Sequence, residues 1–204
     1  MIKIDIIFHI ITMEQALSLA RQRLLEHKED PFKSGKTGIE PDLIGRFLDE
    51  MIELNRFMYT TSSTNCPYNL AFQEMFVGGY IERPKLTDTF ITKLKELKYS
   101  YFIRNFNTGE LVKYLAPGSL ASMLEYEKLN PYRFRRFEEE LGYRHHPLNF
   151  IRNAPQWSGP ELNDDTKTIE DQILKGDIVE LFVVNYTVPL DRNLYSELIK
   201  SLTS

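Results

Sequence analysis

The stretch LTDTFITKLKELKYSYFIRNFNTGELVKYL, residues 86–115, decides the fold. Its first part has apolar residues at helical spacing, which predicts a helix over 86–97 with an inward face of Phe90, Ile91, Leu94 and Leu97. Its second part changes to strand-forming residues at 99–104 and 111–115, and Asn107-Thr108-Gly109 between them is typical of a hairpin turn. We therefore expect a helix that leads into a β-hairpin.

Further strand patterns lie before and after this stretch. Residues 178–184, Ile-Val-Glu-Leu-Phe-Val-Val, form an apolar run typical of a buried strand. In residues 2–11, apolar side chains occupy every second position, which predicts a strand buried mainly on one side. A short strand is expected over 57–61. Residues 72–81 are ambiguous between helix and strand, and we interpret them as a strand because Gly78-Gly79 argues against a helix.

Helical patterns separate these strands. Thr12 and Gln15 have the spacing of a capping box, which predicts a helix from that point to about His27. Pro41-Asp42 predicts the start of a second helix, with an inward face that includes Leu43, Phe47, Leu48, Met51 and Ile52. The remaining helices are expected at 119–129, at 132–141, and from an N-cap at Asp191 through Leu202.

This order of elements predicts an α/β or α+β fold. The length of 204 residues fits one domain over 1–204, built on a mixed β-sheet of about five to six strands flanked by helices. Residues 145–165 combine prolines with apolar residues, so we interpret them as a long irregular connection within the domain.

Composition and charge exclude several classes of protein. The chain has 25 Lys and Arg against 29 Asp and Glu, a net charge of −4, so nucleic acid is not expected as a partner. No apolar run approaches the roughly 20 residues that span a bilayer, so no membrane is expected either. The single cysteine, Cys66, can form no disulfide within the chain and no cysteine-rich zinc site. We expect a cytoplasmic protein without a cofactor or metal.

Three motifs suggest chemistry and have simpler explanations. Ser34-Gly35-Lys36-Thr37 resembles the end of a phosphate-binding loop, but Asp30 stands where that loop needs glycine. His145 and His146 are adjacent, so their side chains diverge and do not meet one metal ion. Residues 132–144 interleave arginine with aromatic residues as nucleic-acid surfaces do, but the spacing is that of an amphipathic helix with internal ion pairs.

The most unusual stretch is residues 54–67, where a strand end meets a run of hydroxyls, an amide and the only thiol. A loop over 60–66 with these residues can offer hydroxyl and backbone N–H groups to an anion or a polar ligand. Nucleophilic catalysis by Cys66 or Ser63 would need a base, which His145 or His146 could supply only through the fold.

The region 54–81 resembles an uncharacterised family of small proteins found in bacteria, phages and large DNA viruses. Leu54-Asn55, Phe57, Thr60 and Ser63 match the first part of the family pattern, and residues 73–80 match its second part, Gln-Arg-x-x-Val-x-Gly. Thr64 replaces the Gln of the pattern and Glu74 replaces its Arg. The resemblance implies no particular activity.

We therefore expect non-catalytic binding of a small polar ligand or a protein partner through the 60–66 loop. The candidate ligand-binding residues are Thr60, Thr61, Ser62, Ser63, Asn65, Gln73, Tyr80 and Arg144. One alternative is a hydrolase or transferase acting on a nucleotide-like substrate, with Cys66 or Ser63, a histidine from 145–146, and Arg144 as an anion anchor. Another is a viral or host-interaction protein that binds through the apolar residues of 148–157.

Overall fold

The computed structural model describes residues 12–29, 48–64, 75–119, 160, 166–185 and 194–204. The α-helices are α1 (Met13–Glu29), α2 (Leu48–Leu54), α3 (Asp88–Glu96), α7 (Glu170–Lys175) and α8 (Leu194–Thr203). Two 3₁₀-helices, η2 (Arg83–Lys85) and η3 (Thr166–Ile169), precede α3 and α7. The strands are β1 (Met58–Thr64), β2 (Met75–Glu82), β3 (Ser100–Asn105), β4 (Glu110–Tyr114) and β5 (Ile178–Asn185).

These strands form one five-stranded sheet in the order β1-β2-β5-β3-β4, which with its flanking helices confirms a single-domain α+β fold. Every pair of neighbouring strands among the described residues is antiparallel. The sequence led us to expect a mixed sheet, because strand patterns alternate with helical patterns along the chain. β2 and β3 do run parallel, but β5 lies between them and is antiparallel to both.

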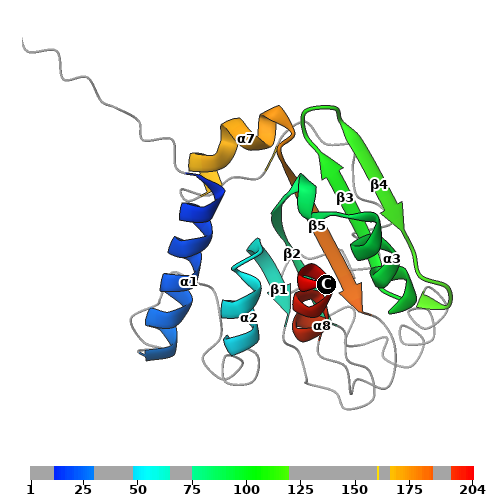
Figure 1. Cartoon of the computed structure of the whole chain (residues 1–204), viewed down its shortest axis with the longest axis horizontal. Helices are drawn as coiled ribbons and strands as arrows, with labels where there is room; N and C mark the ends of the chain where they lie inside the picture. The colour runs from blue at the N-terminus through cyan, green and yellow to red at the C-terminus, as the bar shows by residue number, and fades with distance from the viewer. Residues whose placement is uncertain (1–11, 30–47, 65–74, 120–159, 161–165, 186–193) are drawn as a thin grey trace, which may run out of the picture.

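Helices pack against both faces of the sheet. In Figure 1, α2, α3 and α8 lie over the sheet, α1 stands beside β1, and α7 lies at the end of the sheet. On the first face, α2, α3 and α8 enclose an apolar core with side chains from β1, β2, β3 and β5. Those strand residues are Met58, Val77, Ile81, Tyr101, Val179, Leu181 and Val183. On the second face, α1 and α7 cover the end of the sheet around Tyr59, Tyr80 and Ile178.

Local signals predicted several of the described elements, although α7 was not among those expected. Thr12 and Gln15 form the expected capping box: Thr12 N donates to Gln15 Oε1 (2.8 Å), and Gln15 N donates to Thr12 Oγ1 (3.3 Å). Residues 75–82 form a strand, as we interpreted the ambiguous pattern. The helix and hairpin of 86–115 are confirmed, with Phe90 and Leu94 buried in α3.

The other predicted elements lie outside the described residues. They are the strand at 2–11, the helix start at Pro41-Asp42, the helices at 119–129 (beyond Ser119) and 132–141, most of the connection 145–165, and the cap at Asp191.

Candidate binding site

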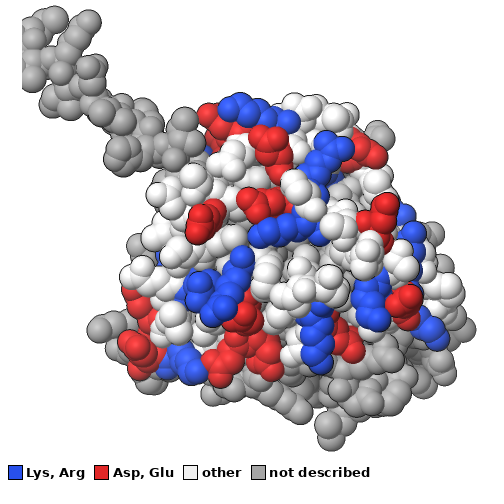
Figure 2. Space-filling model, in the orientation of Figure 1, with Lys and Arg blue, Asp and Glu red and all other residues white. Residues whose placement is uncertain are grey.

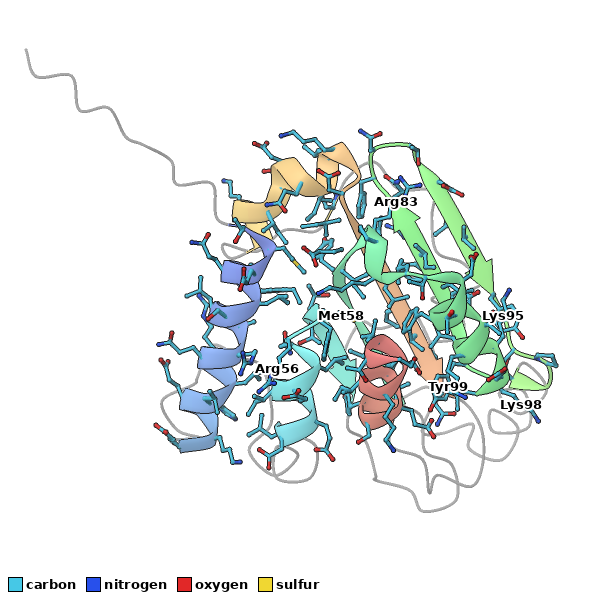
Figure 3. All side chains as sticks on the ribbon, in the orientation of Figure 1. Arg56, Met58, Arg83, Lys95, Lys98 and Tyr99 are labelled. Atoms are coloured by element: carbon cyan, nitrogen blue, oxygen red, sulfur yellow. The ribbon has the colours of Figure 1, made fainter. Side chains whose placement is uncertain are left out.

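A buried asparagine builds the turn between α2 and β1. Asn55 Nδ2 donates to the carbonyl oxygen of Met51 and to Thr60 Oγ1, both at 2.9 Å, and Thr60 N donates to Asn55 Oδ1 (3.1 Å). In Figure 3, the label Arg56 shows the position of this turn, and the label Met58 shows the first residue of β1. Because its hydroxyl and its N–H both bind Asn55, Thr60 has a structural role in the turn.

The hydroxyl-rich segment is a strand for most of its described length. We expected a short strand over 57–61 and a loop over 60–66, but β1 continues to Thr64, and the pairing of Ser63 with Val77 and of Thr64 with Phe76 belongs to the sheet. The physical reason is that β-branched threonines suit a pleated strand, and β2 offers the backbone partner. The expectation of a loop over 62–64 was therefore wrong.

A bulge interrupts β1 within this segment. The register with β2 shifts between Thr60 and Ser62, so Thr61 has no partner residue in the ladder. Thr61 is exposed, and its hydroxyl donates weakly to the carbonyl oxygen of Gly78 (3.4 Å). β1 is also the outermost strand on its side of the described sheet. The bulge thus presents one hydroxyl to solvent at the sheet edge.

Gly79 of β2 allows β1 to approach at the same place. A Cβ on Gly79 would lie 2.0 Å from the carbonyl oxygen of Tyr59 and 2.9 Å from the Cα of Thr60. Only glycine fits this contact, so Gly79 is required by the passage of β1 alongside it. The Val77-Gly78-Gly79 part of the sequence pattern therefore has a structural explanation.

Tyr80 lies on the other side of the sheet from Thr60. It pairs with Tyr59 across the strands, whereas Thr60 pairs with Gly79, and successive residues of a strand face opposite sides. Tyr80 is 3% exposed and packs with residues of α1, namely Met13, Ala16 and Leu17. The structure thus brings Thr60 to the side of Asn55 and Tyr80 to the core beneath α1.

The other candidate residues are Asn65, Cys66, Gln73, Arg144, His145 and His146, and all lie outside the described residues. Ser62 and Ser63 are placed only by their register, opposite Gly78 and Val77. The suggested pairing of Cys66 or Ser63 with a histidine therefore stays a prediction.

The sheet contains a charged pair that was not predicted from the sequence. Arg104 of β3 and Glu180 of β5 are register partners, with Arg104 Nε 3.5 Å from Glu180 Oε2. Their side chains are 9% and 22% exposed. The signal was present: Glu180 interrupts the apolar run of 178–184, and Arg104 stands between Phe102 and Phe106 at strand spacing. A charge within an otherwise buried strand is the pattern that indicates such a pair.

Three further observations concern the charged and titratable groups of the described region. Burial raises the pKa of Tyr101, and the nearby hydroxyl of Tyr114, whose ring stacks on it at 5.3 Å, raises this pKa further. On the face drawn in Figure 2, basic and acidic side chains are interspersed over the described elements. Among the described residues, no cluster of His, Cys, Asp and Glu could hold a metal ion.

Two further findings bear on identity. No helix in the described part of the chain is both long and apolar enough to cross a membrane. Neither a known protein family nor a curated protein matches this sequence. The geometry of the chain itself is therefore the basis for any functional proposal.

Proposed function

We propose that this chain is a non-catalytic binding protein that takes a small polar ligand or a protein partner along residues 60–66. The observation that supports this is the position of the hydroxyl-rich residues, which follow one another along β1, the outermost strand on that side of the described sheet.

An outermost strand is suited to binding because one row of its backbone N–H and C=O groups has no neighbouring strand. Such a row accepts an extended segment of another chain by strand addition. The bulge interrupts the regular pairing of β1 with β2 and leaves Thr61 exposed. The hydroxyl of Thr61 can both donate and accept a hydrogen bond. Both features favour polar recognition at this edge.

The test compares the wild type with a Thr61→Ala, Ser63→Ala variant. Thr60 is left unchanged because its hydroxyl holds the turn at Asn55, so its loss would disturb the fold as well as the site. The matched control is Thr89→Ala, which removes an exposed threonine from α3.

The measurement is thermal unfolding in the presence of nucleotides, dinucleotide cofactors, methyl donors or a library of extended peptides. A ligand present at 100 times its Kd should stabilise the wild type by about 2.7 kcal/mol. We expect one class to stabilise the wild type and Thr89→Ala, and to stabilise the double variant less. Equal stabilisation of all three proteins, or of none by any class, contradicts the proposal.

A further inference from the structure

Arg104 is a buried cation with an unusual environment. Its side chain lies in β3 with only 9% of its surface exposed. The guanidinium carbon is 5.3 Å from the ring centre of Phe102 and 5.5 Å from that of Phe106, the residues two before and two after it in the chain. Two aromatic rings therefore hold the guanidinium by cation–π contacts.

Within the described part of the chain, this guanidinium leaves hydrogen-bonding capacity unused. An arginine side chain has five N–H donors, and a buried charge is normally paired and fully hydrogen-bonded. Within the described part of the chain, the one acidic group in contact is Glu180, 3.5 Å from Nε, and Nε makes no hydrogen bond there. Neither ring offers an oxygen acceptor, so the N–H groups of the guanidinium that do not face Glu180 remain to meet one.

The position of Arg104 leaves a route to that edge. The residue is next to the end of β3, where the hairpin to β4 begins, and its partner in β4 is Leu111. Phe106 and Leu111 are both partly exposed. Nε is fully buried and has no hydrogen-bond partner among the described residues. The two terminal nitrogens are not in this state. The remaining exposure of the side chain therefore includes its terminal N–H groups.

We propose that Arg104 anchors a second binding site, which takes an oxyanion group, either a carboxylate or a phosphate, of a small ligand. The planar fork of a guanidinium matches such a group with two parallel hydrogen bonds, which a neutral acceptor with one oxygen cannot form. Glu180 and the two rings hold the fork in place before binding, so little side-chain freedom is lost when the ligand binds.

The experiment follows the Nε–Hε signal of Arg104 by NMR in the full chain, with the signal assigned by its absence in Arg104→Lys. Inorganic phosphate and acetate are titrated separately, and sodium chloride at matched ionic strength controls for screening. We expect a saturable shift with phosphate or acetate and none with chloride. The anion with the lower Kd distinguishes a phosphate ligand from a carboxylate ligand.

The variants separate binding from folding. Arg104→Lys keeps the charge and loses the fork, so we expect the affinity for the anion, measured by calorimetry, to fall at least about tenfold. The matched control is Arg56→Lys, because Arg56 also pairs through Nε with a glutamate, Glu53 at 2.9 Å, but on the surface. Arg56→Lys should bind as the wild type does.

Two results would overturn the site: a shift of the Arg104 signal that grows linearly without saturation, or equal anion affinity in the wild type and Arg104→Lys. Unchanged circular dichroism and melting temperature establish that Arg104→Lys is folded. The Thr61→Ala, Ser63→Ala variant should keep anion binding, because β5 and β2 separate Arg104 from β1. Failure here therefore leaves the proposal for residues 60–66 unaffected.

Discussion

The two faces of the sheet differ in what they bury. The face under α2, α3 and α8 contains aliphatic and aromatic side chains, and its strand residues come from alternate positions of β1, β2, β3 and β5. The opposite face buries Tyr59, Tyr80 and the pair of Arg104 and Glu180, beside a row of stacked rings. That row consists of Phe76, Phe182 and Phe102, with centroids 5.4 and 5.3 Å apart.

This difference separates stability from recognition. An apolar face stabilises the folded state in proportion to the area that it removes from water, and a cavity in it lowers the free energy of unfolding. A buried ion pair contributes little net stability, because the cost of removing both charges from water offsets their attraction. We therefore expect substitutions on the first face to destabilise the protein strongly, and paired substitutions on the second face to have a small effect on stability.

The largest effect is expected at Gly79, where β1 passes without room for a side chain. Gly79→Ala places a Cβ 2.0 Å from the carbonyl oxygen of Tyr59, so β1 must move or detach. We expect a loss of more than roughly 4 kcal/mol in the free energy of unfolding, measured in urea by circular dichroism. The control is Gly109→Ala, where space is open but φ is +69°, and about 1 kcal/mol should be lost. Similar losses in both would show that the contact with β1 is loose.

The next effect tests the apolar core itself. Leu94 of α3 is completely buried, so Leu94→Ala leaves a cavity between the helix and the sheet. We expect a loss of roughly 3 kcal/mol in the free energy of unfolding. Leu174→Ala removes the same atoms from an exposed position of α7 and should cost less than roughly 0.5 kcal/mol. A small loss at Leu94 would break the contrast between the two faces.

The paired substitution sharpens the contrast on the second face. Arg104→Met alone removes the buried cation that faces Glu180 in the sheet, so we expect a loss of about 2 kcal/mol. Adding Glu180→Leu to this variant should restore most of that loss, since two apolar side chains then pack where two charges stood. Urea denaturation of the wild type, both single variants and the double variant gives the coupling between the residues. A double variant less stable than Arg104→Met would show that the pair supports the fold.

A smaller effect is expected at Asn55, where the sheet edge is tied to α2. Asn55→Ala removes four hydrogen bonds from the turn, of which three are with Thr60. We expect a loss of about 1–2 kcal/mol in the free energy of unfolding. The control, Asn107→Ala, removes an exposed amide that donates to the carbonyl oxygen of Leu174 (2.7 Å), and should cost less. The reverse order would remove the structural role assigned to Asn55.

The smallest effect concerns pH. Burial, and then Tyr114, raise the pKa of Tyr101 in the folded protein above the value of about 10 in the unfolded chain. The folded state therefore holds its proton when the unfolded state has released it, and stability falls as the pH rises from about 10 toward the folded pKa. Tyr101→Phe should lose less stability than the wild type between pH 9 and 11 in urea denaturation. An identical pH dependence would show that Tyr101 does not contribute.

Local patterns were sufficient to predict several of the described elements. The capping box at Thr12, the inward face of α3 and the turn at Asn107-Thr108-Gly109 all involve residues within a few positions of one another. Such signals depend on backbone geometry that neighbouring residues share. The extent of β1 was not predicted, because the length of a strand depends on the strand with which it pairs. The partner β2 lies outside the short stretch of sequence from which the end of β1 was judged.

The sequence by itself therefore predicted α1, α3, the β3–β4 hairpin and the strands β2 and β5, because these follow from the spacing of apolar residues and from turn chemistry. Only the tertiary structure decided the strand order, in which β5 comes from the far end of the chain to lie between β2 and β3. The same insertion brings Glu180 beside Arg104, which is 76 positions earlier in the sequence. Pairing at such separation depends on the packing of the whole sheet, and no local pattern specifies it.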